Sequence, residues 1–83
     1  MFKVRISTHA AKQIKNLPEK INEAVIESFQ ELKDDPYLGK ELSRELAQRY
    51  SYRISVYRII YKINDKDNII NILSVGNRAT VYD

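Results

Sequence analysis

The N-terminal residues alternate between apolar and basic side chains. Residues 2–6 read FKVRI, and this two-residue period predicts a strand with one buried face. Ser7 or Thr8 can cap a following helix, and Pro18 ends that helix because a proline ring does not fit inside it. The chain is therefore predicted to begin with a strand and a short helix.

A second helix is predicted from a period of about four residues. Its apolar positions, which would form one buried stripe, are Ile21, Val25, Phe29 and Leu32. The opposite face carries glutamates at the same spacing, namely Glu19, Glu23, Glu27 and Glu31. We interpret this row as a solvated face, and the alternative is a surface that repels anions. Pro36 ends the helix, because the residue before a proline is driven out of the helical region.

Three further strands are predicted in the second half of the chain, over residues 49–54, 57–63 and 69–75. Ser55-Val56 leaves room only for a tight antiparallel turn, and residues 64–68 (NDKDN) form a polar turn. Gly76-Asn77 is predicted to break the last strand before a short closing segment. Three consecutive strands joined in this way form a meander.

Residues 37–48 are interpreted as a connection between the helices and the meander. Gly39 indicates a turn there, and Leu42 and Leu46 have the spacing of one helical turn. The predicted order is strand, two antiparallel helices, three strands, which is an α+β fold with both helices on one face of the sheet. At 83 residues the chain is expected to form a single domain, residues 1–83.

Charge is distributed unevenly along the chain. The net charge is only +3, yet eight of the eleven acidic residues lie between positions 19 and 45. Residues 46–64 contain no acid and four cations, Arg49, Arg53, Arg58 and Lys62. This division favours a polyanion-facing surface on the second half of the chain. The alternative is the ordinary charge segregation of a small soluble domain.

Several classes of site have no support in the sequence. The chain has no cysteine, one histidine (His9) and two glycines, so thiolate, triad and phosphate-loop chemistry are not indicated. Asp65 and Asp67 share a turn but lack the further ligands of a calcium loop. We therefore expect no metal and no cofactor. Without an apolar run of about 18 residues or a signal peptide, a cytoplasmic protein is expected, with no membrane partner.

Arginine and tyrosine are concentrated in residues 50–61 (YSYRISVYRIIY). Arginine forks match phosphate oxygens, and tyrosine rings stack on bases, so this composition is typical of a nucleic-acid site. For Tyr57 and Tyr61, which share a strand face, the alternative is a place in the core. For Arg58 it is a structural cation on the sheet.

The motifs of the second half follow one another in a recognisable pattern. Residues 57–61 (YRIIY), followed by residues 72–78 (ILSVGNR) and Val81-Tyr82, resemble the RelE/ParE superfamily of type II toxins, on the RelE side. Leu17-Pro18 and residues 35–40 (DPYLGK) also fit, so the resemblance covers essentially the whole chain. It implies a ribosome-dependent endoribonuclease that cleaves mRNA without a metal, by attack of a ribose 2′-hydroxyl on the neighbouring phosphate.

The resemblance also implies roles for individual residues. Arg58 matches the arginine that binds the scissile phosphate, and Arg78 the arginine that stabilises the developing negative charge. Tyr82 matches the tyrosine that stacks on or orients the substrate base. Arg49 falls near a basic position that holds the RNA, and Arg53 and Lys62 are further candidates for RNA binding.

Two positions depart from the pattern of the family. Ser51 and Asn77 stand where relatives carry a basic residue and a histidine, and neither can act as a base near neutral pH. Two alternatives therefore stay open: a ParE-like inhibitor of DNA gyrase, and a non-catalytic module that binds only an antitoxin. The expected partners are a RelB-like antitoxin, the ribosome with its mRNA, and operator DNA through the antitoxin complex alone.

Overall fold

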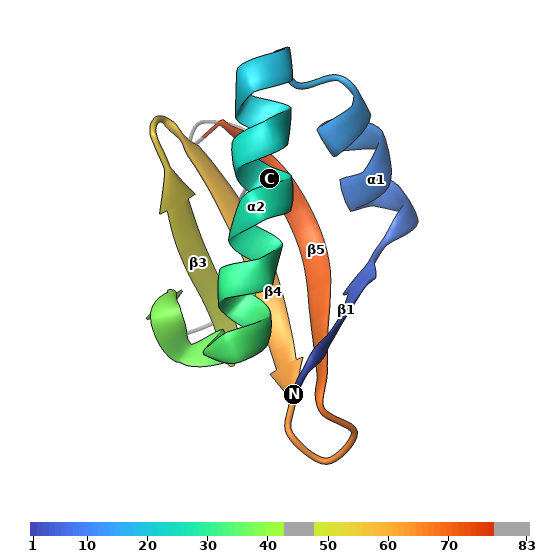
Figure 1. The fold of residues 1–83 in the computed structure, drawn as a ribbon, viewed down its shortest axis with the longest axis vertical. Coiled ribbons are helices and arrows are strands. Elements are labelled where there is room, and N and C mark those ends of the chain that lie inside the picture. Colours follow the sequence, from blue (N-terminus) through green and yellow to red (C-terminus); the bar gives the residue numbers. More distant parts are fainter. Residues whose placement is uncertain (43–47, 78–83) are drawn as a thin grey trace.

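The computed structural model describes residues 1–42 and 48–77, which form a five-stranded sheet with two helices across one face (Figure 1). In chain order the elements are β1 (Lys3–Ile6), α1 (Thr8–Lys15), α2 (Glu19–Asp34), the 3-10 helix η1 (Pro36–Leu38), β2 (Lys40–Glu41), β3 (Arg49–Ile54), β4 (Tyr57–Asn64) and β5 (Ile69–Asn77). The strands lie in the order β1-β5-β4-β3-β2. Only β1 runs parallel to its neighbour, and the other described pairs are antiparallel. The predicted α+β class and the meander are confirmed.

The helices begin and end near the predicted residues. The Ser7 hydroxyl accepts a hydrogen bond of 3.0 Å from the Ala10 amide and so caps α1. Pro18 then separates the two helices, and α2 ends one residue before Asp35-Pro36. Within the described residues, neither helix has the length and apolar character that a bilayer-spanning helix requires.

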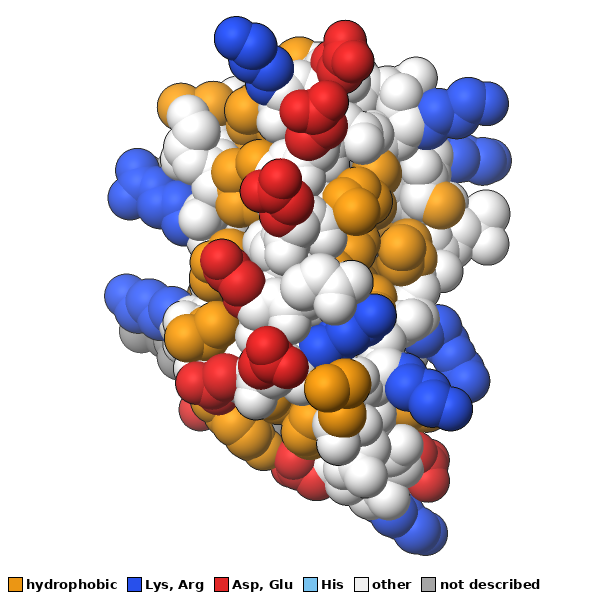
Figure 2. Space-filling model, viewed as in Figure 1, with side chains coloured by type: hydrophobic (Ala, Val, Ile, Leu, Met, Phe, Trp, Pro, Cys, Tyr) orange, Lys and Arg blue, Asp and Glu red, His pale blue; other side chains and the backbone are white. Residues whose placement is uncertain are grey.

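The core lies between α2 and the sheet. Val25, Phe29 and Leu32 are buried as their spacing predicted, whereas Ile21 is only partly buried. They pack against the middle strands through Ile59, Tyr61, Ile70, Ile72 and Val75. The four glutamates of α2 are exposed and form the line of acidic side chains down the helix in Figure 2. Their interpretation as a solvated face is confirmed.

The edge of β5 beyond β1 is covered by α1. Pairing between β1 and β5 ends at Ile6 and Ile72, which leaves the following backbone groups of β5 without a strand partner on that side. The Ser7 hydroxyl donates to the Leu73 carbonyl (3.1 Å), and the Val75 amide donates to Gln13 Oε1 (2.7 Å). The N-cap residue of α1 and a side chain of its last turn therefore fix the second half of β5.

One of the two predictions about glycines is wrong. Gly76-Asn77 does not break the last strand, because β5 continues to Asn77 while pairing with Tyr57 and Arg58 of β4. Gly39 lies at a bend after η1, as predicted, although its φ of −73° and ψ of 167° are those of extended backbone and do not themselves require glycine. The connection also contains η1 and β2, which the sequence did not predict. Of the predicted helical turn, Leu42 follows β2 and Leu46 lies outside the described residues.

Position 39 has room only for a glycine, because a tyrosine hydroxyl occupies the adjacent space. The Tyr61 hydroxyl donates to the Pro36 carbonyl (2.7 Å) and accepts from the Gly39 amide (3.0 Å). A Cβ on Gly39 would lie 2.5 Å from that oxygen. Tyr61 itself is fully buried, so these two bonds join η1 and the start of β2 to the middle of the sheet.

Candidate functional site

The face of the sheet opposite the helices is cationic. Side chains alternate along a strand, and register partners on neighbouring strands share a face. Because Ile59 and Tyr61 face the helices, Arg58, Ile60 and Lys62 of β4 face the other way. The register assigns to the same face the described cations Lys3, Arg5, Lys40, Arg49, Arg53, Arg58 and Lys62. We call this set the cationic face; in the described strands it contains no acidic residue, because Glu41 points to the helix side.

The middle of the cationic face is sheltered from solvent. Ile60 is 4% exposed although it does not belong to the core cluster between the helices and the sheet. Ser51, its register partner on β3, is 9% exposed. This buried floor lowers the local dielectric constant, so the surrounding cations attract an anion more strongly than they would on a fully hydrated surface.

Arg58 lines a pocket of about 320 Å³ at one end of this face, together with Arg53, Ser55, Val56 and Asn77. Arg53 and Arg58 are direct register partners on β3 and β4. Like charges placed opposite one another on a sheet repel, and an anion between them would remove that repulsion. The pocket therefore has the charge expected of a phosphate site.

One nitrogen of the Arg58 guanidinium is not satisfied by the described residues. Its Nε is buried and has no hydrogen-bond partner among the described residues. Leaving a buried donor unpaired costs about 1–3 kcal/mol, more for a charged group. By contrast, Arg53 Nε donates to the Ser55 carbonyl at 3.3 Å, within the β3–β4 turn. A phosphate oxygen in the pocket could accept from Arg58 and offset the cost.

The remaining predicted RNA-binding residues form a second pair. Arg49 and Lys62 are register partners, four residues from Arg53 and Arg58 along their strands. At about 3.4 Å per residue the two pairs are roughly 14 Å apart. The structure thus brings four of the predicted site residues onto one face. Arg78 and Tyr82 lie outside the described residues.

The tyrosines of residues 50–61 are not part of the cationic face. By alternation Tyr50, Tyr52, Tyr57 and Tyr61 lie on the helix side of the sheet. Tyr61 is fully buried, and the Tyr52 hydroxyl donates to Glu31 of α2 at 2.6 Å. The alternative of a place in the core is therefore confirmed for Tyr61, whereas Tyr57 is only partly buried and does not belong to the core cluster. None of the four rings shares a face with the cations proposed to bind RNA.

Sequence reasoning missed three cations of this face, Lys3, Arg5 and Lys40. Alternation within residues 2–6 already directed Lys3 and Arg5 away from the core. The sequence did not predict where β1 lies. It pairs with β5 and is therefore in the same sheet as Arg58. Lys40 was missed because β2, with two residues, has no recognisable strand pattern.

Several tyrosines have pKa values above their ordinary 10. Burial is the main cause for Tyr61, whose pKa rises to about 12. A hydrogen bond to Asp65 is the main cause for Tyr37, which also reaches about 12. The hydrogen bond to Glu31 raises the pKa of Tyr52. The folded state therefore favours neutral phenols.

These shifts predict alkaline sensitivity. A group whose pKa is raised on folding contributes its full stability below its unfolded pKa and loses that contribution as pH rises through its folded pKa. We expect the urea midpoint to be steady up to about pH 10 and to fall between there and about 12. Tyr61→Phe should give a shallower fall, starting from a lower midpoint. A midpoint that stays constant through pH 12 in the wild type would contradict these pKa values.

Comparison with known proteins identifies the family. A model described as the ParE toxin of the type II toxin–antitoxin system parDE matches residues 4–82. The chain is 40% identical to Toxin RelG of Mycobacterium tuberculosis over 83 residues, covering 98% of this chain and 95% of that protein. It is 35% identical to Toxin RelE of the same organism, covering 98% and 86%.

Solved structures agree with this relationship. The structure of this protein matches a chain of the toxin–antitoxin complex RelBE2 from Mycobacterium tuberculosis with a TM-score of 0.86 and 39% sequence identity. The match covers 93% of this chain and 98% of the other. Sequence and fold therefore agree over nearly the whole length: the chain belongs to the ParE toxin family of type II toxin–antitoxin systems, within the RelE/ParE superfamily.

Proposed function

We propose that the protein is the toxin of a type II system that cleaves mRNA on the translating ribosome. The observation that carries this proposal is Arg58, a half-buried arginine whose Nε lacks a partner among the described residues at the centre of a cationic pocket. The negatively charged, acceptor-only oxygens of an RNA phosphodiester suit this donor. The relatives named RelG and RelE support an RNA target over a DNA gyrase target.

The proposed reaction needs no metal. The ribose 2′-hydroxyl loses its proton as its oxygen attacks the adjacent phosphorus, the bond to the 5′-oxygen breaks, and that oxygen takes up a proton, so the products are a cyclic phosphate and a 5′-hydroxyl. Arg58 holds the scissile phosphate, and Arg78 stabilises the charge that develops on its oxygens. Tyr82 orients the base next to the cleaved bond. Arg49, Arg53 and Lys62 hold the flanking backbone.

Proton transfer is the step for which the chain offers the fewest suitable acidic or basic side chains. Ser51 and Asn77 cannot take a proton near neutral pH, and arginine is a poor base because its pKa lies above 12. In the proposal, catalysis therefore depends on charge stabilisation and on the geometry that the ribosome gives the RNA. The cognate antitoxin would cover the cationic face, and operator DNA would be bound only through the antitoxin complex.

One experiment separates this function from its two alternatives. The protein is expressed alone, 5′ ends are mapped on translated mRNA, and gyrase activity is assayed in parallel. Cleavage in the ribosomal A site that is lost in Arg78→Ala supports the proposal. Growth arrest with intact mRNA and cleaved DNA supports the gyrase inhibitor instead, an alternative that the ParE description of the family model keeps relevant. If neither damage occurs, the protein is a binding module.

Salt dependence offers a second measurement. Each phosphate contact with single-stranded RNA contributes roughly 0.7 to the slope of log affinity against log salt. Arg53→Gln and Lys62→Gln should each lower the slope by roughly 0.7–1 unit. Lys20→Gln, an exposed lysine of α2 on the helix side, removes the same charge and serves as the control. Equal slopes for all three variants would argue against RNA binding at the cationic face.

A further inference from the structure

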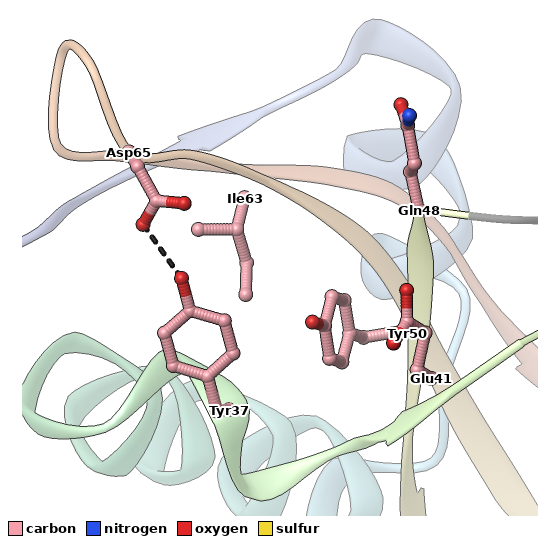
Figure 3. A pocket seen from close by; sticks show the side chains of 6 residues that line it. All are labelled: Tyr37, Glu41, Gln48, Tyr50, Ile63 and Asp65. Carbon is pink, nitrogen blue, oxygen red and sulfur yellow. Dashed lines mark hydrogen bonds between the residues drawn. The ribbon is translucent and has the colours of Figure 1, made fainter.

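A second pocket lies on the helix side of the sheet, near the edge formed by β2 (Figure 3). It measures about 230 Å³ and is lined by Tyr37, Glu41, Gln48, Tyr50, Ile63 and Asp65. Tyr50 and Ile63 belong to strands of the cationic face but point away from it, because each stands one position out of phase with its cations. The proposed RNA site does not use this pocket.

Two tyrosine rings form walls of this pocket. The Tyr37 and Tyr50 rings meet edge to face, with centroids 5.8 Å apart and planes at 75°. Tyr50 is backed by the buried Tyr61 ring, stacked at 5.6 Å and 21°. On the other wall, the Tyr37 hydroxyl donates to Asp65 at 2.7 Å (Figure 3). Both rings are thus held in place before any ligand arrives, and the faces of such rings attract cations.

The pocket is also negative, although the protein as a whole carries +3. Glu41 and Asp65 reach it from β2 and from the β4–β5 turn. Burial, followed by the charges of Glu41 and Asp65, raises the pKa of Tyr50, so both carboxylates act on the same space. Within residues 1–42 and 48–77, no lysine or arginine forms an ion pair with either of them.

Shape and charge together point to one kind of ligand. Sites for drug-sized molecules usually occupy about 300–1,000 Å³, so a pocket of this size suits a single side chain. The described residues hold no group of three or more His, Cys, Asp or Glu side chains arranged for a metal ion. Aromatic walls with two carboxylates instead match an organic cation, and above all the flat guanidinium of arginine.

We infer that this pocket receives an arginine or lysine side chain of the antitoxin. The inference rests on the proposed function in one respect, that the protein partner is an antitoxin. An antitoxin that covers the cationic face must be acidic there, whereas this pocket requires a basic residue from another part of the same partner. Opposite charges at two separate places would fix the orientation of the partner on the toxin.

The first test uses the isolated protein and a small probe, N-acetyl-arginine amide. We expect ring signals of Tyr37 and Tyr50 to shift in NMR titrations with millimolar affinity. The citrulline analogue, which has the same shape without the charge, should bind at least tenfold more weakly. Glu41→Gln combined with Asp65→Asn keeps the side-chain shapes and should weaken binding of the arginine probe by a similar factor. Equal binding of both probes, or no effect of the double variant, would overturn the inference.

The second test uses the complex with the cognate antitoxin. The Glu41→Gln/Asp65→Asn variant should bind the antitoxin at least tenfold more weakly in calorimetry. Glu19→Gln combined with Glu23→Gln removes the same charge from the exposed face of α2 and should change affinity less than twofold. Unchanged antitoxin affinity in the first variant would overturn the inference, even if the arginine probe binds.

The outcome for this pocket is separable from that for the RNA site. Glu41→Gln/Asp65→Asn should cleave mRNA like the wild type, so a failure of this inference leaves cleavage intact. If the wild-type protein does not cleave mRNA, the proposed function is wrong, but the titration with the arginine probe still tests the pocket. Arg44→Gln tests another occupant: if this change strengthens probe binding more than threefold, the chain fills the pocket with its own arginine and the inference is wrong.

Discussion

Arg58→Gln is expected to slow mRNA cleavage at least a hundredfold and to leave the protein as stable as the wild type or more so. Removing one preorganised donor from a developing oxyanion typically lowers kcat about 10²–10³-fold. The free protein, however, gains from the same change, because Nε is buried without a partner among the described residues and Arg53 stands directly opposite. Relief of that repulsion should raise the free energy of unfolding by roughly 0.5–1 kcal/mol.

The two readouts distinguish a functional arginine from a structural one. Cleavage is measured by mapping 5′ ends in a translation reaction, and stability by urea denaturation. Arg5→Gln is the matched control, since it removes one arginine from the same face on β1, at the far edge of the sheet. It should change cleavage less than threefold. If Arg58→Gln lowers stability by more than 1 kcal/mol, Arg58 is a structural cation and the loss of cleavage has another cause.

Gly39→Ala is expected to destabilise the fold by about 2–4 kcal/mol. The new Cβ would lie 2.5 Å from the Tyr61 hydroxyl and 3.0 Å from the Ser51 carbonyl, so β2 or Tyr61 must move. Movement of Tyr61 would break its bond to the Pro36 carbonyl, which is buried. Because the backbone at Gly39 is extended, the effect is steric and not conformational.

A thermodynamic cycle tests this explanation. Tyr61→Phe alone should cost about 1–3 kcal/mol, because the Pro36 carbonyl and Gly39 amide lose their partner. In the double variant the methyl group meets no hydroxyl, so the combined loss should be smaller than the sum of the single losses. Urea denaturation of the four proteins measures this. Additive losses would show that the hydroxyl is not the obstacle.

The sequence predicted elements well and contacts poorly, for physical reasons. Alternation and the four-residue period depend on neighbours along the chain, so β1, α2 and the meander could be found. The pairing of Arg53 with Arg58 follows from the two-residue turn between them and was also within reach. The position of β1 beside β5, by contrast, depends on contacts between residues more than sixty positions apart.

The two glycines also show that local patterns do not reveal contacts between distant residues. Gly39 was predicted to mark a turn and does lie at a bend, but its small size also accommodates Tyr61, 22 residues later. Gly76 was predicted to end a strand that pairing with Arg58 instead continues. The Tyr37–Asp65 contact that forms one wall of the second pocket joins residues 28 positions apart. No local pattern marks such a pair.

The parallel pairing of the first strand with the last has a consequence for the order of folding. Among the described strands β1 pairs with β5 alone, so it has no partner in the described part of the sheet until β5 has been synthesised. Contacts between distant parts of a chain form slowly, because a long loop must close first. A nascent chain therefore cannot assemble the complete cationic face while its C-terminal part is still being made.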